Sequence, residues 1–178
     1  LCGGDGLDTA FYQGGRAGFT VGHTAGGYTV TGGNEGSDSL AGVERLWFSD
    51  GRLALDLDGN AGKVAKLLGA VFGASFVKDA AIVGIGLRLL DGGMSYQDLM
   101  QLAIDFRVGA DATNAQVVDL LCSNIGLTSA AERANYVDLL DRGVETQASL
   151  GQWAADTSLN LLQIDLVGLA ANGIAYAA

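Results

Sequence analysis

The spacing of apolar residues changes once along this chain, near residue 58, and this change constrains the fold more than any other feature. Before it, apolar and β-branched residues alternate with polar ones in short runs separated by Gly-Gly, Gly-Asn and Asp-Gly pairs. Such runs are typical of short strands joined by tight turns. After it, apolar residues recur every three or four positions, which is the spacing of amphipathic helices. The sequence therefore predicts a small β segment followed by a helical part.

We expect an α+β fold with a β segment at residues 1–58 and a helical domain at residues 59–178. The strands are predicted within residues 10–12, 18–21, 27–31, 43–48 and 53–57. The helical spacing predicts about seven helices, the last of them over residues 159–169.

The helical part also contains an internal duplication. Residues 89–93 (Leu-Leu-Asp-Gly-Gly) match residues 139–143 (Leu-Leu-Asp-Arg-Gly), and with a one-residue gap residues 99–105 match residues 150–156. Two similar helical units that each expose an apolar stripe bury it against each other. We therefore expect a bundle built from a duplicated unit, rather than a ligand groove between the two halves.

Composition sets the class of protein. The 178 residues include 20 acidic and 10 basic side chains, giving a net charge of −10, and 49% are apolar while 17% are charged. A chain this apolar is expected to fold. The shortage of Lys and Arg argues against nucleic acid and anionic membrane surfaces as partners, because phosphates are neutralised by basic side chains. No run of 18 apolar residues occurs, so no membrane-spanning helix is expected.

Few residues are available for catalysis or for a zinc site. His23 is the single histidine, expected at the surface, and Cys2 and Cys122 lie 120 positions apart. This excludes most zinc clusters, cysteine–histidine dyads and the H-E-x-x-H helix. Cys122 lies in an apolar helical run and is expected to pack as a small apolar side chain, with a bridge to Cys2 left open. Carboxylate pairs such as Asp138 with Asp141 lack a nucleophile motif, so no enzyme is expected.

One motif carries binding chemistry. Residues 3–11 (Gly-Gly-Asp-Gly-Leu-Asp-Thr-Ala-Phe) fit G-G-x-G-x-D-x-U-x, the repeat of calcium-binding parallel β-rolls, and a degenerate copy with one inserted residue occupies residues 32–40. Glycines permit the tight turn that directs carbonyl oxygens at an ion, and aspartates supply charge to the hard cation Ca²⁺. The predicted calcium ligands are the carbonyls of Gly3, Gly4 and Gly6 and the carboxylates of Asp5, Asp8 and Asp38.

Alternatives to a complete site remain open. A roll site needs oxygen atoms from two successive turns, and this chain has one clean copy. The turn therefore forms a partial site, a site completed by an upstream turn, or a solvated loop that binds nothing. The acidic run at residues 56–60 is not an EF-hand, because Leu67 stands where the loop requires glutamate. Asp58 or Asn60 is predicted to cap the first helix instead.

The order of these segments resembles the C-terminal region of secreted bacterial RTX proteins, over nearly the whole chain. In that family a last repeat leads into a strand of the form I-E-R-L-x-F-x-D-G and then into a helical domain of unknown function, common in extracellular RTX and surface-layer-like proteins. The closing A-N-G-I-E-Y of that family is similar to Ala-Asn-Gly-Ile-Ala-Tyr at residues 171–176. The family's G-R-x-P-D-x-x-G-x-x-Y-W stretch is matched only loosely, by residues 126–137. The segments that carry the resemblance are residues 3–11, 28–31, 36–40, 43–51, 55–62 and 169–176.

The resemblance implies a non-catalytic C-terminal module of a calcium-binding protein. It implies type I secretion with an uncleaved C-terminal signal, calcium-triggered folding outside the cell, and a secreted, extracellular or cell-surface location. The expected partners are calcium ions and upstream repeats of the same polypeptide, because the chain begins within a repeat. The alternative is an adhesive or self-assembly module whose helical domain binds a protein, a glycan or its own copies. Its contact residues would come from Tyr12, Tyr96, Tyr136 and Trp153, although aromatic residues at helical spacing are core residues more often.

Overall fold

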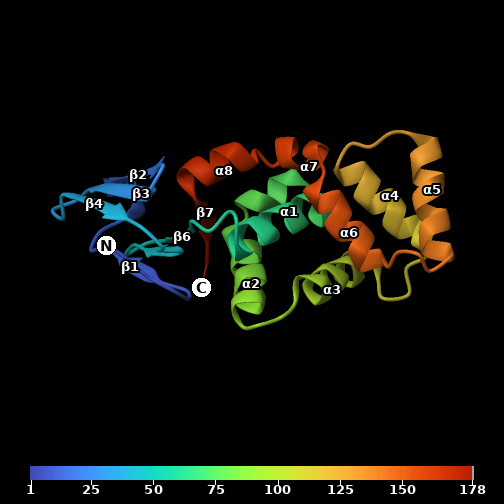
Figure 1. The fold of residues 1–178 in the computed structure, drawn as a ribbon, viewed down its shortest axis with the longest axis horizontal. Helices are drawn as coiled ribbons and strands as arrows, with labels where there is room; N and C mark the ends of the chain where they lie inside the picture. The colour runs from blue at the N-terminus through green and yellow to red at the C-terminus, as the bar shows by residue number, and fades with distance from the viewer. Residues whose placement is uncertain (178) are drawn as a thin grey trace.

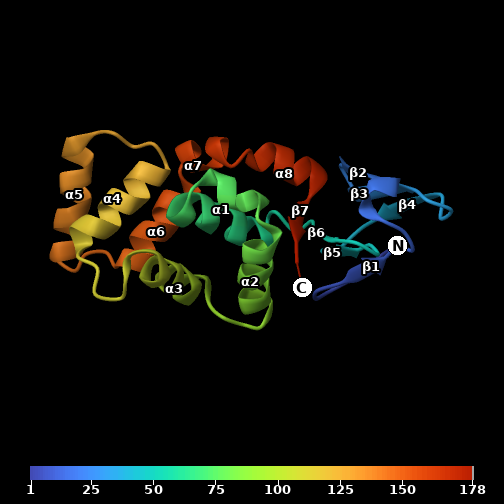
Figure 2. The same ribbon diagram turned by 180° about the vertical axis from the view of Figure 1, so that it is seen from behind.

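The computed structural model describes residues 1–177 and is elongated, with the strands at one end and helices α4 and α5 at the other (Figures 1 and 2). The strands are β1 (Thr9–Phe11), β2 (Phe19–Thr24), β3 (Gly27–Gly32), β4 (Ser37–Leu40), β5 (Arg45–Trp47), β6 (Arg52–Ala54) and β7 (Ile174–Tyr176). The α-helices are α1 (Asn60–Phe72), α2 (Ala80–Asp91), α3 (Tyr96–Val108), α4 (Asn114–Asn124), α5 (Ala130–Asp141), α6 (Gln147–Asp156), α7 (Ser158–Gln163) and α8 (Leu166–Asn172). Short 3₁₀ turns are η1 (Arg16–Gly18) and η2 (Ala74–Lys78).

The strands form two sheets, and the predicted α+β class is confirmed. One sheet has the order β1-β5-β6-β7, in which β1 runs parallel to β5 and the other neighbours are antiparallel. The other sheet is antiparallel with the order β2-β3-β4. Strand β7 pairs with β6, with Ile174 opposite Ala54. The last residues of the expected helical domain therefore return to the β segment and complete its sheet.

The β end of the molecule, residues 1–58, has its own apolar core. The rings of Tyr12, Phe19 and Phe48 lie with centroids 5.2–5.6 Å apart at its centre. Tyr12 is only 5% exposed, so it is a core residue and not one of the surface contacts considered for an adhesive module. The buried residues of this core are Ala10, Tyr12, Phe19, Val21, Val30, Leu40, Leu46, Phe48, Leu53 and Leu55.

A larger core joins the helices. It contains most of the apolar stripe positions that the sequence predicted, from Val64 in α1 to Ile164 after α7, whereas Ile85, Leu102 and Phe106 of the same stripes are exposed. The described residues hold eight α-helices rather than about seven, because the expected last helix is interrupted. Asp165 adopts a left-handed backbone conformation with φ 51°, and its side chain accepts a hydrogen bond from the Gly168 N–H to start α8. A single helix cannot pass through such a residue.

The duplication is visible in the helix turns. Helices α2 and α3 are joined by a turn through Gly93, and α5 and α6 by a turn through Gly143, both with positive φ. An L-residue with a side chain rarely adopts this conformation, which explains the glycines. Helices α3 and α6 pack closely, since a Cβ on Gly151 would come within 2.8 Å of the Met100 side chain. The two units therefore bury their matching faces against each other, as expected.

A polar contact repeats as well. The side chain of Asn60, the first residue of α1, donates to the Asp91 carboxylate at 2.9 Å, and Asn114, the first residue of α4, donates to Asp141 at 2.8 Å. Each asparagine ties the start of one helix to the end of another in its own unit.

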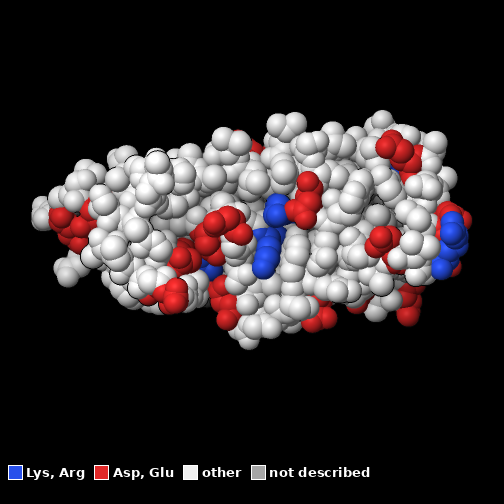
Figure 3. Space-filling view, viewed as in Figure 1, with Lys and Arg blue, Asp and Glu red and all other residues white. Residues whose placement is uncertain are grey.

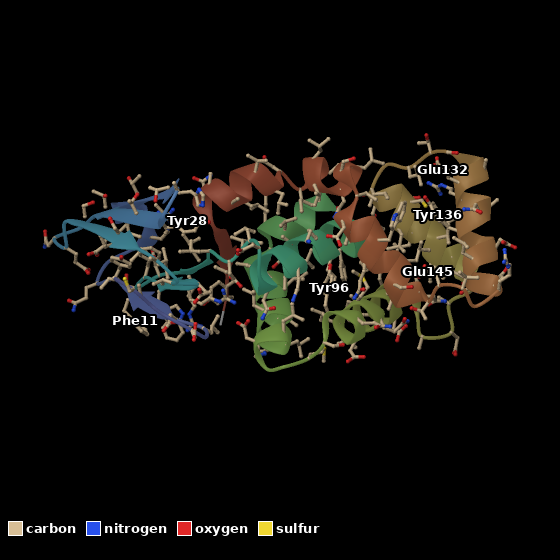
Figure 4. The ribbon with its side chains drawn as sticks, viewed as in Figure 1. Phe11, Tyr28, Tyr96, Glu132, Tyr136 and Glu145 are labelled. Atoms are coloured by element: carbon tan, nitrogen blue, oxygen red, sulfur yellow. The ribbon has the colours of Figure 1, made fainter. Side chains whose placement is uncertain are left out.

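Several contacts hold the β end against the helices. The hydroxyl of Tyr28 lies 2.7 Å from the carbonyl oxygen of Ala170 in α8 and 3.1 Å from that of Leu55 (Figure 4). The Ala177 N–H donates to the carbonyl of Ala80 at 2.7 Å. Among the described residues, none of the helices has both the length and the apolar character needed to cross a membrane.

Candidate functional site

The turn at residues 3–8 lies beside residues 41–45, and the two segments run parallel. The Gly3 N–H donates to the Ala41 carbonyl at 3.0 Å, and the Ala41 N–H donates to the Leu1 carbonyl at 3.0 Å. Immediately after the turn, β1 and β5 pair in parallel, with Thr9 opposite Arg45. Residues 1–11 and residues 41–47 therefore form two stacked coils. Each coil consists of a short extended segment, a turn and a strand, which is β1 in the first coil and β5 in the second.

Glycine is required at the closest approach of the two turns. A Cβ on Gly3 would overlap the carbonyl oxygen of Gly42 and come within 2.7 Å of the Asp8 Cβ. Gly4 and Gly6 have φ values of 108° and 109°, a region that favours glycine. In residues 1–177, the carbonyls of Gly3, Gly4 and Gly6 accept no hydrogen bond from a backbone or side-chain donor. The sequence pattern thus corresponds to real backbone constraints in this turn.

Asp8 ends the turn and is held on three sides. Its N–H donates to Glu44 Oε2 at 2.9 Å, and its carbonyl accepts the N–H groups of Glu44 and Arg45 at 3.2 and 3.0 Å. Its carboxylate oxygen Oδ2 is buried, and in residues 1–177 it has no hydrogen-bond partner. An unpaired buried carboxylate oxygen is unfavourable, so this atom favours a water molecule or a cation as its partner.

The other two predicted carboxylates lie elsewhere. Asp5 is exposed in the turn. Asp38 lies on β4, where its carboxylate accepts a hydrogen bond from the Tyr12 hydroxyl at 3.3 Å. Burial, followed by the charge of Asp38, raises the pKa of Tyr12 to about 12. Within residues 1–177, no three His, Cys, Asp or Glu side chains gather in a metal-binding group, so Asp5, Asp8 and Asp38 do not form one cluster.

The degenerate second copy forms a hairpin. Residues 28–31 pair antiparallel with residues 37–40, and the Gly32 N–H donates to the Gly36 carbonyl at 3.0 Å. The segment that stacks on the first turn is instead residues 41–45, in which Glu44 occupies the place beside Asp8. Sequence comparison could not identify Glu44, because residues 41–45 lack the glycine and aspartate spacing of the repeat.

An acidic hollow of about 460 Å³ opens beside this turn. Acidic side chains gather on this face, where the β end meets α1 and α2 (Figure 3). The lining residues are Gly6, Leu7, Glu44, Asp56, Asp58, Gly59, Asn60, Leu90 and Asp91.

Arg45 lies at the base of the acidic region and is 2% exposed. Its guanidinium forms an ion pair with Asp56 through Nη1, and its Nη2 donates to both carboxylate oxygens of Asp91, at 3.1 and 2.9 Å. Burial disfavours the charged guanidinium, but the two carboxylates outweigh it and raise the pKa of Arg45. Arg45 thus neutralises much of the acidic cluster and joins β5 to α2.

The two carboxylates considered as a catalytic pair, Asp138 and Asp141, have structural partners. Asp138 pairs with Arg142 at 3.0 Å, and Asp141 accepts from Asn114. Cys2 and Cys122 are free thiols, and Cys122 is buried in α4 as predicted. The His23 ring packs edge-on against Tyr28, with centroids 4.9 Å apart.

Comparisons with protein-family models, with curated proteins and with solved structures gave no match. The functional assignment therefore depends on the residues and their geometry.

Proposed function

We propose that this chain is the non-catalytic C-terminal module of an extracellular RTX-type protein, and that its first turn binds Ca²⁺. The observation that carries the proposal is the buried, unpartnered Oδ2 of Asp8 in a glycine turn stacked on a parallel neighbour. Carbonyl oxygens of Gly3, Gly4 and Gly6 accept no hydrogen bonds in residues 1–177 and supply further ligands. Ca²⁺ prefers such oxygen sets.

The proposed mechanism is thermodynamic linkage. Ca²⁺ that binds the folded turn and not the unfolded chain stabilises the fold, by about 2.7 kcal/mol at a concentration 100 times the Kd. The chain would remain loosely folded where calcium is scarce and fold fully outside the cell. Calcium-linked folding of this kind suits type I secretion and a secreted or cell-surface location.

The proposed partner of the turn is an upstream repeat of the same polypeptide. Strand β1 is at the end of its sheet, with β5 as its neighbour among the described strands. The parallel pairing of β1 with β5 is the pattern that another coil would continue. Such a coil would also add oxygen ligands on the open side of the turn, near Asp5.

Thermal unfolding by circular dichroism tests the calcium proposal. We expect the Tm to rise in millimolar Ca²⁺ relative to EGTA, and Mg²⁺ not to reproduce this rise. Asp8→Asn should remove the rise because it removes the charge from the buried ligand. Asp111→Asn, at an exposed loop position, is the matched control and should keep it. A calcium-dependent rise that survives in Asp8→Asn would reject this site.

A second candidate function, self-assembly through the helical domain, is favoured by one apolar groove. The groove has a volume of about 300 Å³ between α1, α2 and α3, and its lining is entirely apolar. Phe106 at its edge is 82% exposed, and an exposed apolar surface of this kind is typical of interaction sites. The proposed occupant is a second copy of this chain. Light scattering across concentration should show a dimer that Phe106→Ser dissociates, and a monomer at all concentrations would reject it.

A further inference from the structure

One face of the four-stranded sheet carries a row of aromatic and arginine side chains. Phe11, Trp47, Arg52 and Tyr176 lie directly opposite one another on β1, β5, β6 and β7. The Arg52 guanidinium lies 3.9 Å from the centre of the Trp47 ring, and the Trp47 indole N–H donates to the Tyr176 hydroxyl at 3.1 Å. Phe11, at the outer end of the row, is 66% exposed (Figure 4).

Two hollows adjoin this row and share Arg52. The smaller, of about 300 Å³, lies between the sheet and α2 and contains Arg45, Arg52 and Arg88. The larger, of about 560 Å³, contains Arg16 and Arg52. Tyr176 also lines both hollows, and Trp47 lines the smaller one.

The charge of this face is opposite to that of the molecule. The chain carries a net charge of −10, yet the two hollows are lined by four of its ten basic residues and only two acidic ones, Asp50 and Asp91. Asp91 and Asp56 both pair with Arg45, so the unpaired positive charge of the smaller hollow comes from Arg52 and Arg88, and Asp50 accepts the backbone N–H of Arg16. Within residues 1–177, Arg52 and Arg88 form no salt bridge.

We propose that the smaller hollow binds an acidic sugar unit through its carboxylate, which goes beyond the calcium-linked role proposed above. Arg52 and Arg88 provide planar donor groups that match a carboxylate. Trp47 and Tyr176 of the aromatic row line the same hollow and offer apolar contact to a sugar ring, with the Arg52 guanidinium stacked on Trp47 beside them. A volume of about 300 Å³ is at the small end of ligand sites and suits one sugar unit rather than a peptide segment.

Titration of D-glucuronate onto the ¹⁵N-labelled chain tests this site, with shifts followed at the amides of β6 and α2. D-glucose has the same ring without the carboxylate, and N-acetylaspartate has two carboxylates and no ring. We expect saturable binding of glucuronate, and binding at least tenfold weaker for the two comparison compounds. Arg52→Gln and Arg88→Gln should each weaken glucuronate binding at least tenfold.

Arg107→Gln is the matched control, because it changes the net charge equally at an exposed position in α3 that lines neither hollow. It should bind glucuronate as the unchanged protein does, and circular dichroism establishes that all three variants are folded. Absence of glucuronate binding, or equal losses in Arg52→Gln and Arg107→Gln, would overturn the proposal. Equal binding of N-acetylaspartate would overturn the assignment to a sugar.

Discussion

Arg45 remains charged while 2% exposed because Asp56 and Asp91 contact its guanidinium from two different parts of the chain. The side chains of both aspartates are themselves mostly buried. Removing one partner of such a network leaves the other charges buried without compensation. The free-energy cost of these uncompensated charges is larger than the net stabilisation that the intact network provides.

We therefore expect Arg45→Met to lower the free energy of unfolding by about 3–5 kcal/mol, measured by urea denaturation. Arg142→Met is the control, because its ion pair with Asp138 is exposed and should contribute about 1 kcal/mol or less. A change of similar size in both variants would contradict the structural role of Arg45.

A second prediction at the residue scale concerns Tyr12. Its pKa is raised from 10.0 to about 12, first by burial and then by Asp38, so the folded state holds the proton more tightly than the unfolded state. The resulting stabilisation is fully present below pH about 10 and is lost as the pH rises toward about 12. Urea unfolding at pH 9, 10 and 11 should show falling stability, with a shallower fall in Tyr12→Phe. An identical pH slope in the two proteins would contradict it.

The candidate site was only partly predictable from the sequence. The glycines and Asp8 follow a spacing that local backbone geometry requires, so a pattern search finds them. Asp91 lies 46 residues from Arg45, and nothing local signals that the two meet. The helix cap was predicted at Asp58 or Asn60, but Asp56 Oδ2 accepts the N–H groups of Asn60 and Ala61, at 2.9 and 3.3 Å. Gly59 at the cap position has no side chain, and the turn brings Asp56 back to replace it.

At the scale of elements, periodicity identified the strands and helices whose faces are buried and missed those that depend on distant pairing. Strand β4 has the sequence Ser-Asp-Ser-Leu, which resembles a repeat turn more than an apolar strand. Strand β7 has three residues, and its partner β6 precedes it by about 120 positions. Such short strands are stable only through tertiary contacts, which local patterns do not encode.

Gly84 tests how β7 is held. It lies within α2, where alanine would be favoured by about 1 kcal/mol on helix propensity alone. A Cβ there would overlap the carbonyl oxygen of Ala177, which follows β7. We expect Gly84→Ala to lower the free energy of unfolding by about 1–3 kcal/mol and to speed hydrogen exchange in β7. Gly18→Ala, where a Cβ meets nothing within 4 Å, should change stability by less than about 0.5 kcal/mol. Unchanged exchange in β7 would contradict the contact.

At the scale of the whole molecule, the β end and the helices have separate cores but several shared contacts. Arg45 reaches α2, β7 completes the sheet, and Tyr28 reaches α8. Two cores unfold cooperatively when the free energy of the contacts between them exceeds the difference between their free energies of unfolding. We therefore expect one cooperative transition rather than two.

The two tryptophans report on the two parts separately, because Trp47 lies in β5 and Trp153 in α6. In the Trp153→Phe variant, fluorescence follows the β end, and in the Trp47→Phe variant it follows the helices. The Trp47→Phe substitution also removes the contact with Arg52 and so changes stability, and each variant is therefore compared only with its own circular dichroism. For each variant, the urea midpoint measured by fluorescence should coincide with the urea midpoint measured by far-ultraviolet circular dichroism, which reports the loss of helix. In the Arg45→Met background the two signals should separate, with the sheet unfolding first, because the contact between β5 and α2 is lost while the helical core is intact. Separate transitions already present with Arg45 in place would mean that the β end and the helices fold independently.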